Sequence, residues 1–529
     1  MVEKLATLWP EITLLVGACV CLFLGLAPSA TARRAPAWIA AAALIVAALI
    51  AWFGADVHEM GGLALYVKLM VVAVGLLLLM LVAQVPDQLK QVTEAEAHAG
   101  SRFEPGDVMR GEFFAFFLLS LAGVMLCAGA NDLVWLFLAL ELTSLPAYVM
   151  VAISRDRIAA QESAIKYFFL GAMAAAVFLY GFTLIYGATG TTQFDAIARY
   201  VGENGASPLF VTGLVLAVVG IGFKIAAVPM HFYAADVYEG AAVSVTAFLA
   251  FVPKTAGFVS IILLLGLGGQ TLPEAVTWLV WAMAAATMTV GNVLGLLQHN
   301  VKRVLAYSSI AHSGYMLVAL VGGVAASTGS ALGNGVAAVL FYLIAYALGN
   351  LGAFAVLGCL RARGEEADTF DDISGLSNRH PALAAIMLVS MLSLVGLPPL
   401  VGFVGKVYLF GTAIQHGFVW LVIIAVLNSA VSAVYYLRIA AACYFGEPEE
   451  RTQAAALGPR QFSAMIAAVA ALLLGVSGNW LVNATIAAAA PMVTPRAVAT
   501  ERKSVDEPVA DIADLADATM QGRADSVEP

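Results

Sequence analysis

The apolar residues of this chain gather into fourteen runs separated by short polar segments. A helix needs about 20 predominantly apolar residues to cross the hydrocarbon core of a bilayer. The pattern therefore predicts an all-α polytopic membrane protein with about fourteen transmembrane helices. These predicted helices cover residues 9–27, 36–54, 62–85, 111–130, 132–153, 163–187, 208–230, 242–266, 276–297, 302–323, 333–360, 382–415, 418–445 and 462–488.

Two of these runs contain prolines that a continuous helix does not tolerate. Pro229 lies at the end of the seventh run, and its missing N–H leaves the carbonyl of Ile225, four residues earlier, without a helical partner. The twelfth run is too long for one straight span and contains Pro398-Pro399. Open backbone at membrane depth is tolerated only where it is buried in protein or lines water. We therefore expect helices seven and twelve to be discontinuous and to border a hydrated site.

The two broken helices occupy matching places in an internal repeat. Helices 4–8 and 9–13 form two sets of five, and an odd number inverts the second set in the membrane. The fourth member of each set is interrupted by proline and carries a lysine, Lys224 in one and Lys406 in the other. Matched broken helices in two halves are typical of an ion or substrate pathway. The alternative is chance combined with ordinary proline kinks.

Basic residues in the loops predict the orientation. With the N-terminus outside, the outer loops between helices receive Arg199 and little else, as the positive-inside rule requires. Both termini then lie outside. The inner side receives Arg33, Arg34, Lys90, Arg102, Arg110, Arg155, Arg157, Lys302, Arg303, Arg361, Arg363, Arg379, Arg451 and Arg460.

Composition agrees with this class and excludes several others. The chain has 529 residues, of which 61% are hydrophobic and 12% charged, and its mean hydropathy is +0.91. Much of the net charge of −9 comes from residues 491–529, an acidic tail that we expect to be disordered. Residues 12–27 resemble a signal peptide, but Glu3 offsets Lys4 and no basic region precedes them, so we expect a retained helix. Nothing indicates nucleic acid as a partner.

The cysteines and glycines give no sign of a cofactor. The five cysteines form no C-x-x-C pair, and no glycine-rich nucleotide loop is present. We therefore expect no metal, flavin, nucleotide or iron–sulfur centre in this chain.

The predicted helices and loops divide the chain into five parts. These are three N-terminal helices with an inner loop (1–110), the first five-helix repeat (111–266), the second repeat (276–445), a C-terminal helix (446–490) and the acidic tail (491–529).

Ionisable residues inside the apolar runs are the candidates for function, because a charge at the centre of a bilayer costs about 2.5–3.5 kcal/mol on insertion scales. Lys68 and Arg438 lie nearer helix ends, where their side chains can extend to the interface. The others are Glu141, Glu162, Lys166, Lys224, His231, Lys254, His312 and Lys406.

Ion pairing cannot neutralise all of these groups, because four lysines face two glutamates. Burial favours a neutral amine and a nearby carboxylate favours an ammonium, so a lysine held between the two influences can gain and lose a proton. A proton relay needs that property. Glu162 and Lys166 are four residues apart on one helix, and a simple ion pair near the inner surface is the alternative for them. His231 and His312 are either proton carriers or packed core residues.

The segment around Pro229 has a recognisable sequence. Residues 223–254 read FKIAAVPMHFYAADVYEGAAVSVTAFLAFVPK. This segment resembles helices seven and eight of the antiporter-like subunits of proton-pumping NADH:quinone oxidoreductase, respiratory complex I, in the form typical of subunit N (subunit 2 in mitochondria). Three further motifs extend the resemblance to about residues 110–445: ESAIKYFFLGAMAAAVFLYG at 162–181, NVKRVLAYSSIAHSGY at 300–315 and GLPPLVGFVGK at 396–406.

The resemblance implies roles for individual residues. Glu141 and Lys224 are similar to the paired glutamate and lysine of helices five and seven, and Lys254 to the central lysine of helix eight. Lys406 is similar to the lysine of helix twelve, and Lys166 to a helix-six lysine characteristic of subunit N. The chain departs from the family where H-x-W-TPD would be HFYAAD and where EGAP-x-PVT would be EGAAVSVT. These changes affect the loop between helices seven and eight.

The expected function is therefore proton translocation by an antiporter-like subunit of complex I, driven by quinone reduction elsewhere. The resemblance implies that NADH, FMN, iron–sulfur clusters and quinone belong to other parts of the complex. It implies subunits M, K, J and L and the lipid bilayer as partners, and the bacterial inner membrane as the location. The alternatives are a subunit of a multisubunit Na⁺/H⁺ antiporter or related membrane-bound hydrogenase, and a structural scaffold whose lysines are only paired.

Overall fold

The computed structural model describes residues 7–27, 32, 35–54, 62–83, 105–154, 158–268, 272–324, 333–362, 365–447, 452–454 and 458–493. Each of the fourteen predicted segments contains most of a helix or of a pair of helices, although the seventh, 208–230, is helical only to Ile221. Most of the loop at 86–110 and of the tail at 491–529 lies outside the described residues. The helices are α2 (Trp9–Gly25), α4 (Pro36–Phe53), α6 (Gly62–Val82), α8 (Pro105–Ala128), α9 (Leu133–Ile153), α10 (Ile158–Thr189), α11 (Phe194–Asn204), α12 (Pro208–Ile221), α13 (Ala234–Gly240), α14 (Val243–Gly266), α15 (Glu274–Leu296), α16 (Val301–Leu320), α17 (Gly335–Cys359), α18 (Leu376–Arg379), α19 (Pro381–Val395), α20 (Val401–Gln415), α21 (Val419–Phe445), α22 (Pro459–Ser477) and α23 (Asn479–Val493).

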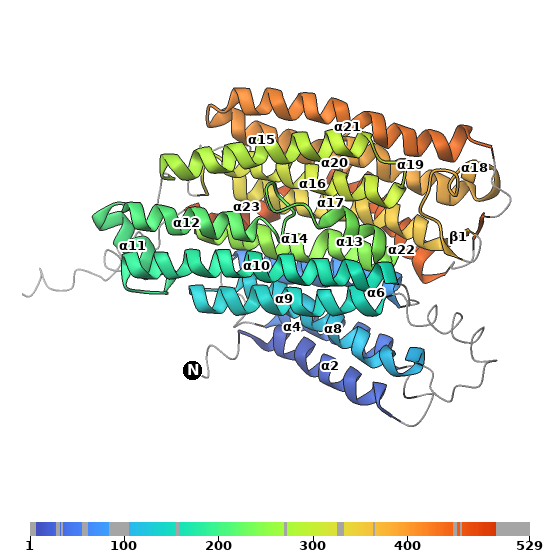
Figure 1. Cartoon of the computed structure of the whole chain (residues 1–529), viewed down its shortest axis with the longest axis horizontal. Coiled ribbons are helices and arrows are strands. Elements are labelled where there is room, and N and C mark those ends of the chain that lie inside the picture. The colour runs from blue at the N-terminus through green and yellow to red at the C-terminus, as the bar shows by residue number, and fades with distance from the viewer. Residues whose placement is uncertain are drawn as a thin grey trace, which may run out of the picture.

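The helices lie side by side in one bundle (Figure 1). Within the described residues, ten of them are long and apolar enough to cross a membrane, and α2, α12 and α19 are shorter apolar helices. The prediction of an all-α, multi-pass membrane protein is confirmed. The expected single helix at 462–488 is divided, with α22 ending at Ser477 and α23 beginning at Asn479.

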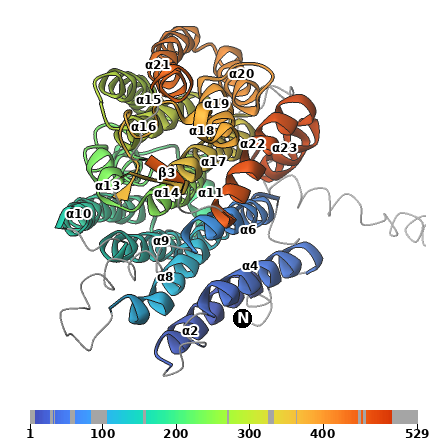
Figure 2. The ribbon, with the colours of Figure 1, turned by 90° about the vertical axis from the view of Figure 1, so that its right-hand side faces the viewer.

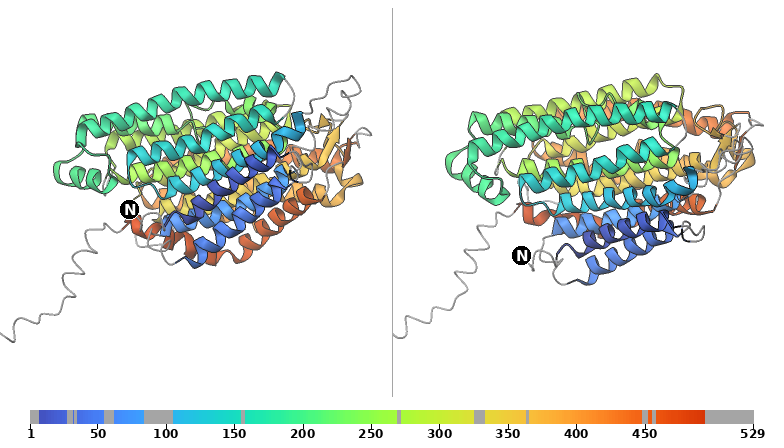
Figure 3. Two further views of the ribbon diagram at one scale, coloured as in Figure 1. Left: turned by 90° about the horizontal axis from the view of Figure 1, so that it is seen from below. Right: turned by 60° about the horizontal axis from the view of Figure 1, so that its bottom comes forward.

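Helices α14 and α17 form the interior of the bundle. In the most apolar stretch of α14 every residue is buried, and in that of α17 94% are. A helix that is hydrophobic on all sides needs such a central position. Viewed along the helices, α2 and α4 lie at one edge and α15 and α21 at the other (Figure 2). The blue N-terminal helices and the red C-terminal ones lie alongside each other, and α6 packs against α22 and α23 (Figure 3).

Both predicted helix interruptions are present. Helix α12 ends at Ile221, and residues 222–233 run through turns before α13 begins. Helix α19 ends at Val395, where Gly396 takes a left-handed φ of 88°, and α20 resumes at Val401. The discontinuity of helices seven and twelve is therefore confirmed.

The two basic residues that we expected to extend to the interface are instead held by protein. Lys68 on α6 is 0% exposed and its amine lies 2.9 Å from the carboxylate of Glu11 on α2. The expectation for Lys68 is wrong, because a buried carboxylate on a neighbouring helix gives the amine a partner inside the bundle. The guanidinium of Arg438 packs 4.0 Å from the ring centroid of Phe370 and donates to the carbonyl of Gln298.

A small antiparallel sheet, which the helical pattern did not predict, joins the ends of α17 and α22. Its strands are β1 (Leu360–Ala362), β2 (Glu365–Glu366) and β3 (Thr452–Ala454), in the order β2-β1-β3. Next to it, Arg460 in the first turn of α22 is fully buried. Its guanidinium donates to the carbonyls of Leu81 and Gly358 at 3.1 and 2.7 Å, tying α22 to α6 and α17.

Candidate functional site

The buried end of the first broken helix holds an ion pair. Lys224 lies in the turn after α12, and its amine is 3.1 Å from Glu141 Oε1 on α9. The amine also donates to the hydroxyl of Ser144, one turn further along α9, at 2.5 Å. Lys224 is 2% exposed, and the Glu141 side chain is 19% exposed. The predicted pairing of these two charges is present in the structure.

The backbone opens where Pro229 predicts it. Four residues before the proline, the carbonyl of Ile225 accepts hydrogen bonds from the Lys254 amine, at 3.2 Å, and from the Ser313 hydroxyl. The next residue, Ala226, takes a left-handed φ of 54° that L residues rarely adopt. A buried carbonyl without a partner would be costly, so the amine of Lys254 compensates the bond that Pro229 cannot make.

Within the described residues, the hydrogen-bond partners of Lys254 on α14 are all neutral. Besides Ile225, its amine donates to the carbonyl of Ser309 and to the hydroxyl of Ser313 on α16. The ring centroid of Tyr346 on α17 lies 5.6 Å away. The amine is therefore buried among dipoles, without a carboxylate partner.

The second broken helix repeats this arrangement. Val395 lies four residues before Pro399, and its carbonyl accepts a hydrogen bond from the Lys406 amine at 2.7 Å. The same amine donates to the hydroxyl of Ser429 on α21 at 2.8 Å and lies 4.9 Å from the ring centroid of Tyr315. In both halves a lysine bonds the carbonyl that the proline leaves free.

The two candidate histidines differ in their surroundings. His312 on α16 is 2% exposed, and its Nδ1 and Nε2 each lie 2.8 Å from a tyrosine hydroxyl, of Tyr342 and Tyr436 respectively. His231 stacks on Phe232, with centroids 4.4 Å apart, and its buried Nδ1 has no partner in the described residues. His312 thus lies in a polar network, whereas no hydrogen bond within the described part of the chain links His231 to a lysine.

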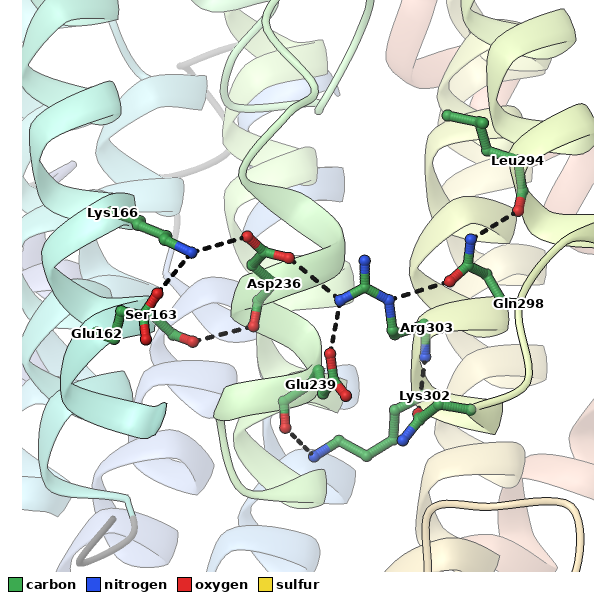
Figure 4. Close-up of polar contacts among 10 residues, drawn as sticks. Glu162, Ser163, Lys166, Asp236, Glu239, Leu294, Gln298, Lys302 and Arg303 are labelled. Atoms are coloured by element: carbon green, nitrogen blue, oxygen red, sulfur yellow. Dashed lines mark hydrogen bonds and ion pairs between the residues drawn. The ribbon is translucent and has the colours of Figure 1, made fainter. Parts of the chain in front are cut away.

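Glu162 and Lys166 belong to a different group, which we call the ionic cluster: Glu162, Lys166, Asp236, Glu239 and Arg303 (Figure 4). Lys166 contacts Glu162 at 2.8 Å and Asp236 at 3.1 Å, and the two helical side chains are 43% and 62% exposed. Arg303 Nη1 reaches Asp236 at 3.1 Å and Glu239 at 2.6 Å. The cluster therefore ties α13 to α10 and α16 and does not include the buried lysines.

Electrostatics in the ionic cluster favour fixed charges. Partial burial raises the pKa of Asp236, but hydrogen bonds from Lys166 and Arg303 outweigh it, so the pKa lies below its usual value. Beside the cluster, Lys302 donates to the carbonyls of Glu239 and Ala241, at 2.9 and 2.7 Å, and so caps the C-terminal end of α13. These contacts hold the loop between the first broken helix and α14.

The sequence reasoning missed the hydroxyl and amide groups around the lysines. Ser144, Ser313 and Ser429 each bond one lysine. The signal available was their presence on helices that carry candidate charges, as in the SSIAHSGY segment, but serines are too common to single out. A second network, joining the fully buried Asn292 to Tyr315, Asn428 and Tyr435, lies next to Lys406 and was also missed.

Over the described ranges, no three His, Cys, Asp or Glu side chains come close enough together to hold a metal ion.

Known proteins resemble this chain over most of its length. A family model described as NADH:quinone oxidoreductase/Mrp antiporter, TM, matches residues 130–432. A protein named NADH-quinone oxidoreductase subunit N from Trichlorobacter lovleyi is 45% identical over 342 residues, covering 64% of this chain and 69% of the relative. One of the same name from Alkalilimnicola ehrlichii is 36% identical over 490 residues, covering 90% and 95%.

A solved structure has the same fold. A chain of respiratory complex I from Thermus thermophilus with bound aureothin superposes with a TM-score of 0.73 at 30% identity, covering 90% of this chain and 100% of that one. The resemblance inferred from the motifs is confirmed. The chain belongs to the NADH-quinone oxidoreductase subunit N family, within the wider NADH:quinone oxidoreductase/Mrp antiporter membrane family.

Proposed function

We propose that this chain, as a proton-translocating membrane subunit of NADH:quinone oxidoreductase, moves protons along Glu141, Lys224, Lys254, His312 and Lys406. One observation carries the proposal. At each helix break, the carbonyl that lies four residues before the proline accepts a hydrogen bond from a buried lysine amine. A titratable group placed at a helix interruption couples its protonation to the local backbone, which is what a driven relay requires.

The first half of the path begins at the Glu141–Lys224 pair. A proton on the pair can reside on the carboxylate or on the amine, because the two groups lie 3.1 Å apart. The peptide of Ile225 adjoins Lys224 in sequence and bonds the Lys254 amine in space. The break therefore connects the ion pair to the central lysine.

The second half runs from Lys254 to Lys406 through α16. Ser309 and Ser313, which bond Lys254, lie on the same helix as His312. The imidazole is bonded at both nitrogens by tyrosine hydroxyls, so it can exchange a proton through either. We place His231 and the ionic-cluster residues Glu162 and Lys166 on the inner side of this path.

The energy for this movement comes from outside the chain. We propose that quinone reduction in other subunits drives the relay, and that neighbouring membrane subunits of the M, K, J and L types pack against it. We further place the chain in the bacterial inner membrane with both termini outside, on the distribution of loop arginines and lysines. The similar solved chain belongs to respiratory complex I from Thermus thermophilus, which supports partners of this kind.

A Na⁺/H⁺ antiporter subunit is the second candidate, because the matching family model covers both classes. The names of the relatives with 36–45% identity favour the oxidoreductase. The helices shared by the two classes do not distinguish them.

Substitutions at Lys406 test the relay. Arginine keeps a positive charge but cannot release its proton in a protein, whereas glutamate titrates with the opposite charge. We expect Lys406→Arg to lose NADH-driven proton uptake in membrane vesicles and Lys406→Glu to retain more of it, at matched assembly. A structural charge requires the reverse order, so equal or better function with arginine would contradict the proposal.

A further inference from the structure

All three buried lysines of the proposed path have a serine hydroxyl as a partner. The amines of Lys224, Lys254 and Lys406 donate to Ser144, Ser313 and Ser429 at 2.5, 2.5 and 2.8 Å. The serines come from three different helices, α9, α16 and α21, so the pattern does not arise from one local motif. The lysines' other hydrogen-bond acceptors are a carboxylate or backbone carbonyls.

A hydroxyl differs from those other partners because it can both donate and accept. Carbonyls and ionised carboxylates only accept, so they satisfy an ammonium with its three N–H groups. A neutral amine has two N–H groups and a lone pair that needs a donor. Among the groups bonded to Lys254, only the Ser313 hydroxyl can supply one.

Two of the three serines are oriented for both states. The Ser144 hydroxyl donates to the carbonyl of Leu140, and that of Ser313 donates to the carbonyl of Ile225. Rotation about the C–O bond of either serine would turn the proton toward the lysine nitrogen. The exchange replaces one hydrogen bond by another, so the neutral amine gains the donor that its lone pair needs.

Lys166 provides the contrast within the same chain. Its amine bonds two carboxylates, of Glu162 and Asp236, and no hydroxyl in the part of the chain that the structure describes. Both partners favour the ammonium. A lysine with this set of partners is suited to a permanent charge, which agrees with its place in the ionic cluster.

We infer that Ser144, Ser313 and Ser429 are positioning residues for proton transfer, each stabilising both the charged and the neutral form of its lysine. This inference rests on the proposed function. Removing the hydroxyl leaves the carboxylate or carbonyl acceptors of the ammonium in place but removes the donor to the neutral amine. The change therefore hinders release of the proton more than its uptake.

Threonine and valine have the same shape and separate the hydroxyl from the packing. We expect Ser313→Thr to retain NADH-driven proton uptake. In Ser313→Val the uptake per assembled complex should fall roughly tenfold, which corresponds to about 1.4 kcal/mol. The solvent deuterium isotope effect on uptake should rise in the valine variant, because proton release from the lysine becomes slower. Ser429→Thr and Ser429→Val give a second pair at a half-buried position.

A serine without a lysine serves as the control. Ser260 on α14 is fully buried and its hydroxyl donates to the carbonyl of Ala256 on its own helix. Proton uptake per complex should be the same in Ser260→Val as in Ser260→Thr.

The outcomes distinguish the serine inference from the proposed function. If Lys406→Arg abolishes uptake but the threonine and valine variants behave alike at both serines, the serine inference is wrong and the relay stands. Unchanged uptake in all lysine variants would overturn the relay itself. Valine variants that match threonine in uptake and isotope effect refute the hydroxyl role, whatever their stability.

Discussion

Replacing two of the buried lysines by methionine should give different effects on stability. Methionine has nearly the length of lysine and no charge, so Lys224→Met and Lys254→Met each delete an amine with little change in packing. Lys224 is paired with the carboxylate of Glu141, whereas Lys254 has only neutral partners. The two substitutions therefore leave different groups behind.

The magnitudes follow from those partners. Removing one member of a buried ion pair costs about 3–5 kcal/mol, and because Glu141 keeps 19% of its side chain exposed we take this as an upper limit for Lys224→Met. Lys254→Met loses three hydrogen bonds, worth together about 3 kcal/mol. It also removes the insertion penalty of a buried lysine, about 2.5–3.5 kcal/mol. The net change is within about 1 kcal/mol of zero.

Lys254→Met leaves no buried carbonyl without a hydrogen-bond donor, so no further cost is added to this sum. In the variant the carbonyl of Ile225 still accepts the hydroxyl of Ser313. The carbonyl of Ser309 lies within α16, where a backbone N–H of the helix donates to it. We expect Lys254→Met to assemble and resist heating like the parent complex, and Lys224→Met to dissociate at a lower temperature. Both should lose NADH-driven proton uptake.

The measurement is the fraction of the intact complex on a native gel after a series of heating steps, together with proton uptake in vesicles. Oxidation of NADH by an artificial electron acceptor, which needs no proton translocation, normalises the amount of complex. If Lys254→Met lost as much stability as Lys224→Met, the central amine would be a structural tie and not a balanced relay group.

Three further changes test other parts of the structure. Lys68→Met should destabilise the complex by about 3–5 kcal/mol, and adding Glu11→Gln should restore most of the loss in the same heating assay, because no unpaired buried charge then remains. Asp236→Asn should cost at most about 1 kcal/mol at neutral pH and less in high salt. Since the pKa of Asp236 is lowered in the folded state, its contribution should be present above the ordinary carboxyl pKa and disappear as the pH falls through the lowered value. Pro229→Ala restores an N–H that competes for the Ile225 carbonyl, so proton uptake should fall while assembly on a native gel is unchanged.

The sequence pattern was sufficient for the helices and the two interruptions, whereas the Glu141–Lys224 pair followed from the resemblance to the family. Long apolar runs and prolines act locally, so their positions translate directly into helix bounds. A pairing between buried side chains of distant helices cannot be predicted from the local sequence in this way. Lys68 was misplaced because nothing local links it to Glu11, which lies 57 positions earlier in the chain. The same holds for the serine partners, since a serine in a helix most often bonds a carbonyl of its own helix.

The inverted repeats supply equivalent chemistry from positions that are not equivalent. In the second half, Lys406 bonds a carbonyl of its own broken helix, on the far side of the prolines. In the first half, the carbonyl of Ile225 accepts a hydrogen bond from Lys254 on the following helix. Lys224, which lies next to the break, is paired with Glu141 instead. A residue-by-residue comparison of the two halves therefore misses the shared feature, which is an amine at the carbonyl that proline leaves free.

This asymmetry has a consequence for the order of proton movement. Glu141 is the one carboxylate bonded to any of the three buried path lysines in the described residues, so only the Lys224 end of the path is neutralised when its lysine is charged. Beyond it, Lys254, His312 and Lys406 have neutral partners. A proton added to one of these groups then makes protonation of the next less favourable, because like charges repel strongly where water is scarce. We expect a proton that enters at Lys254 to favour release at Lys406, so that the path carries one charge forward at a time.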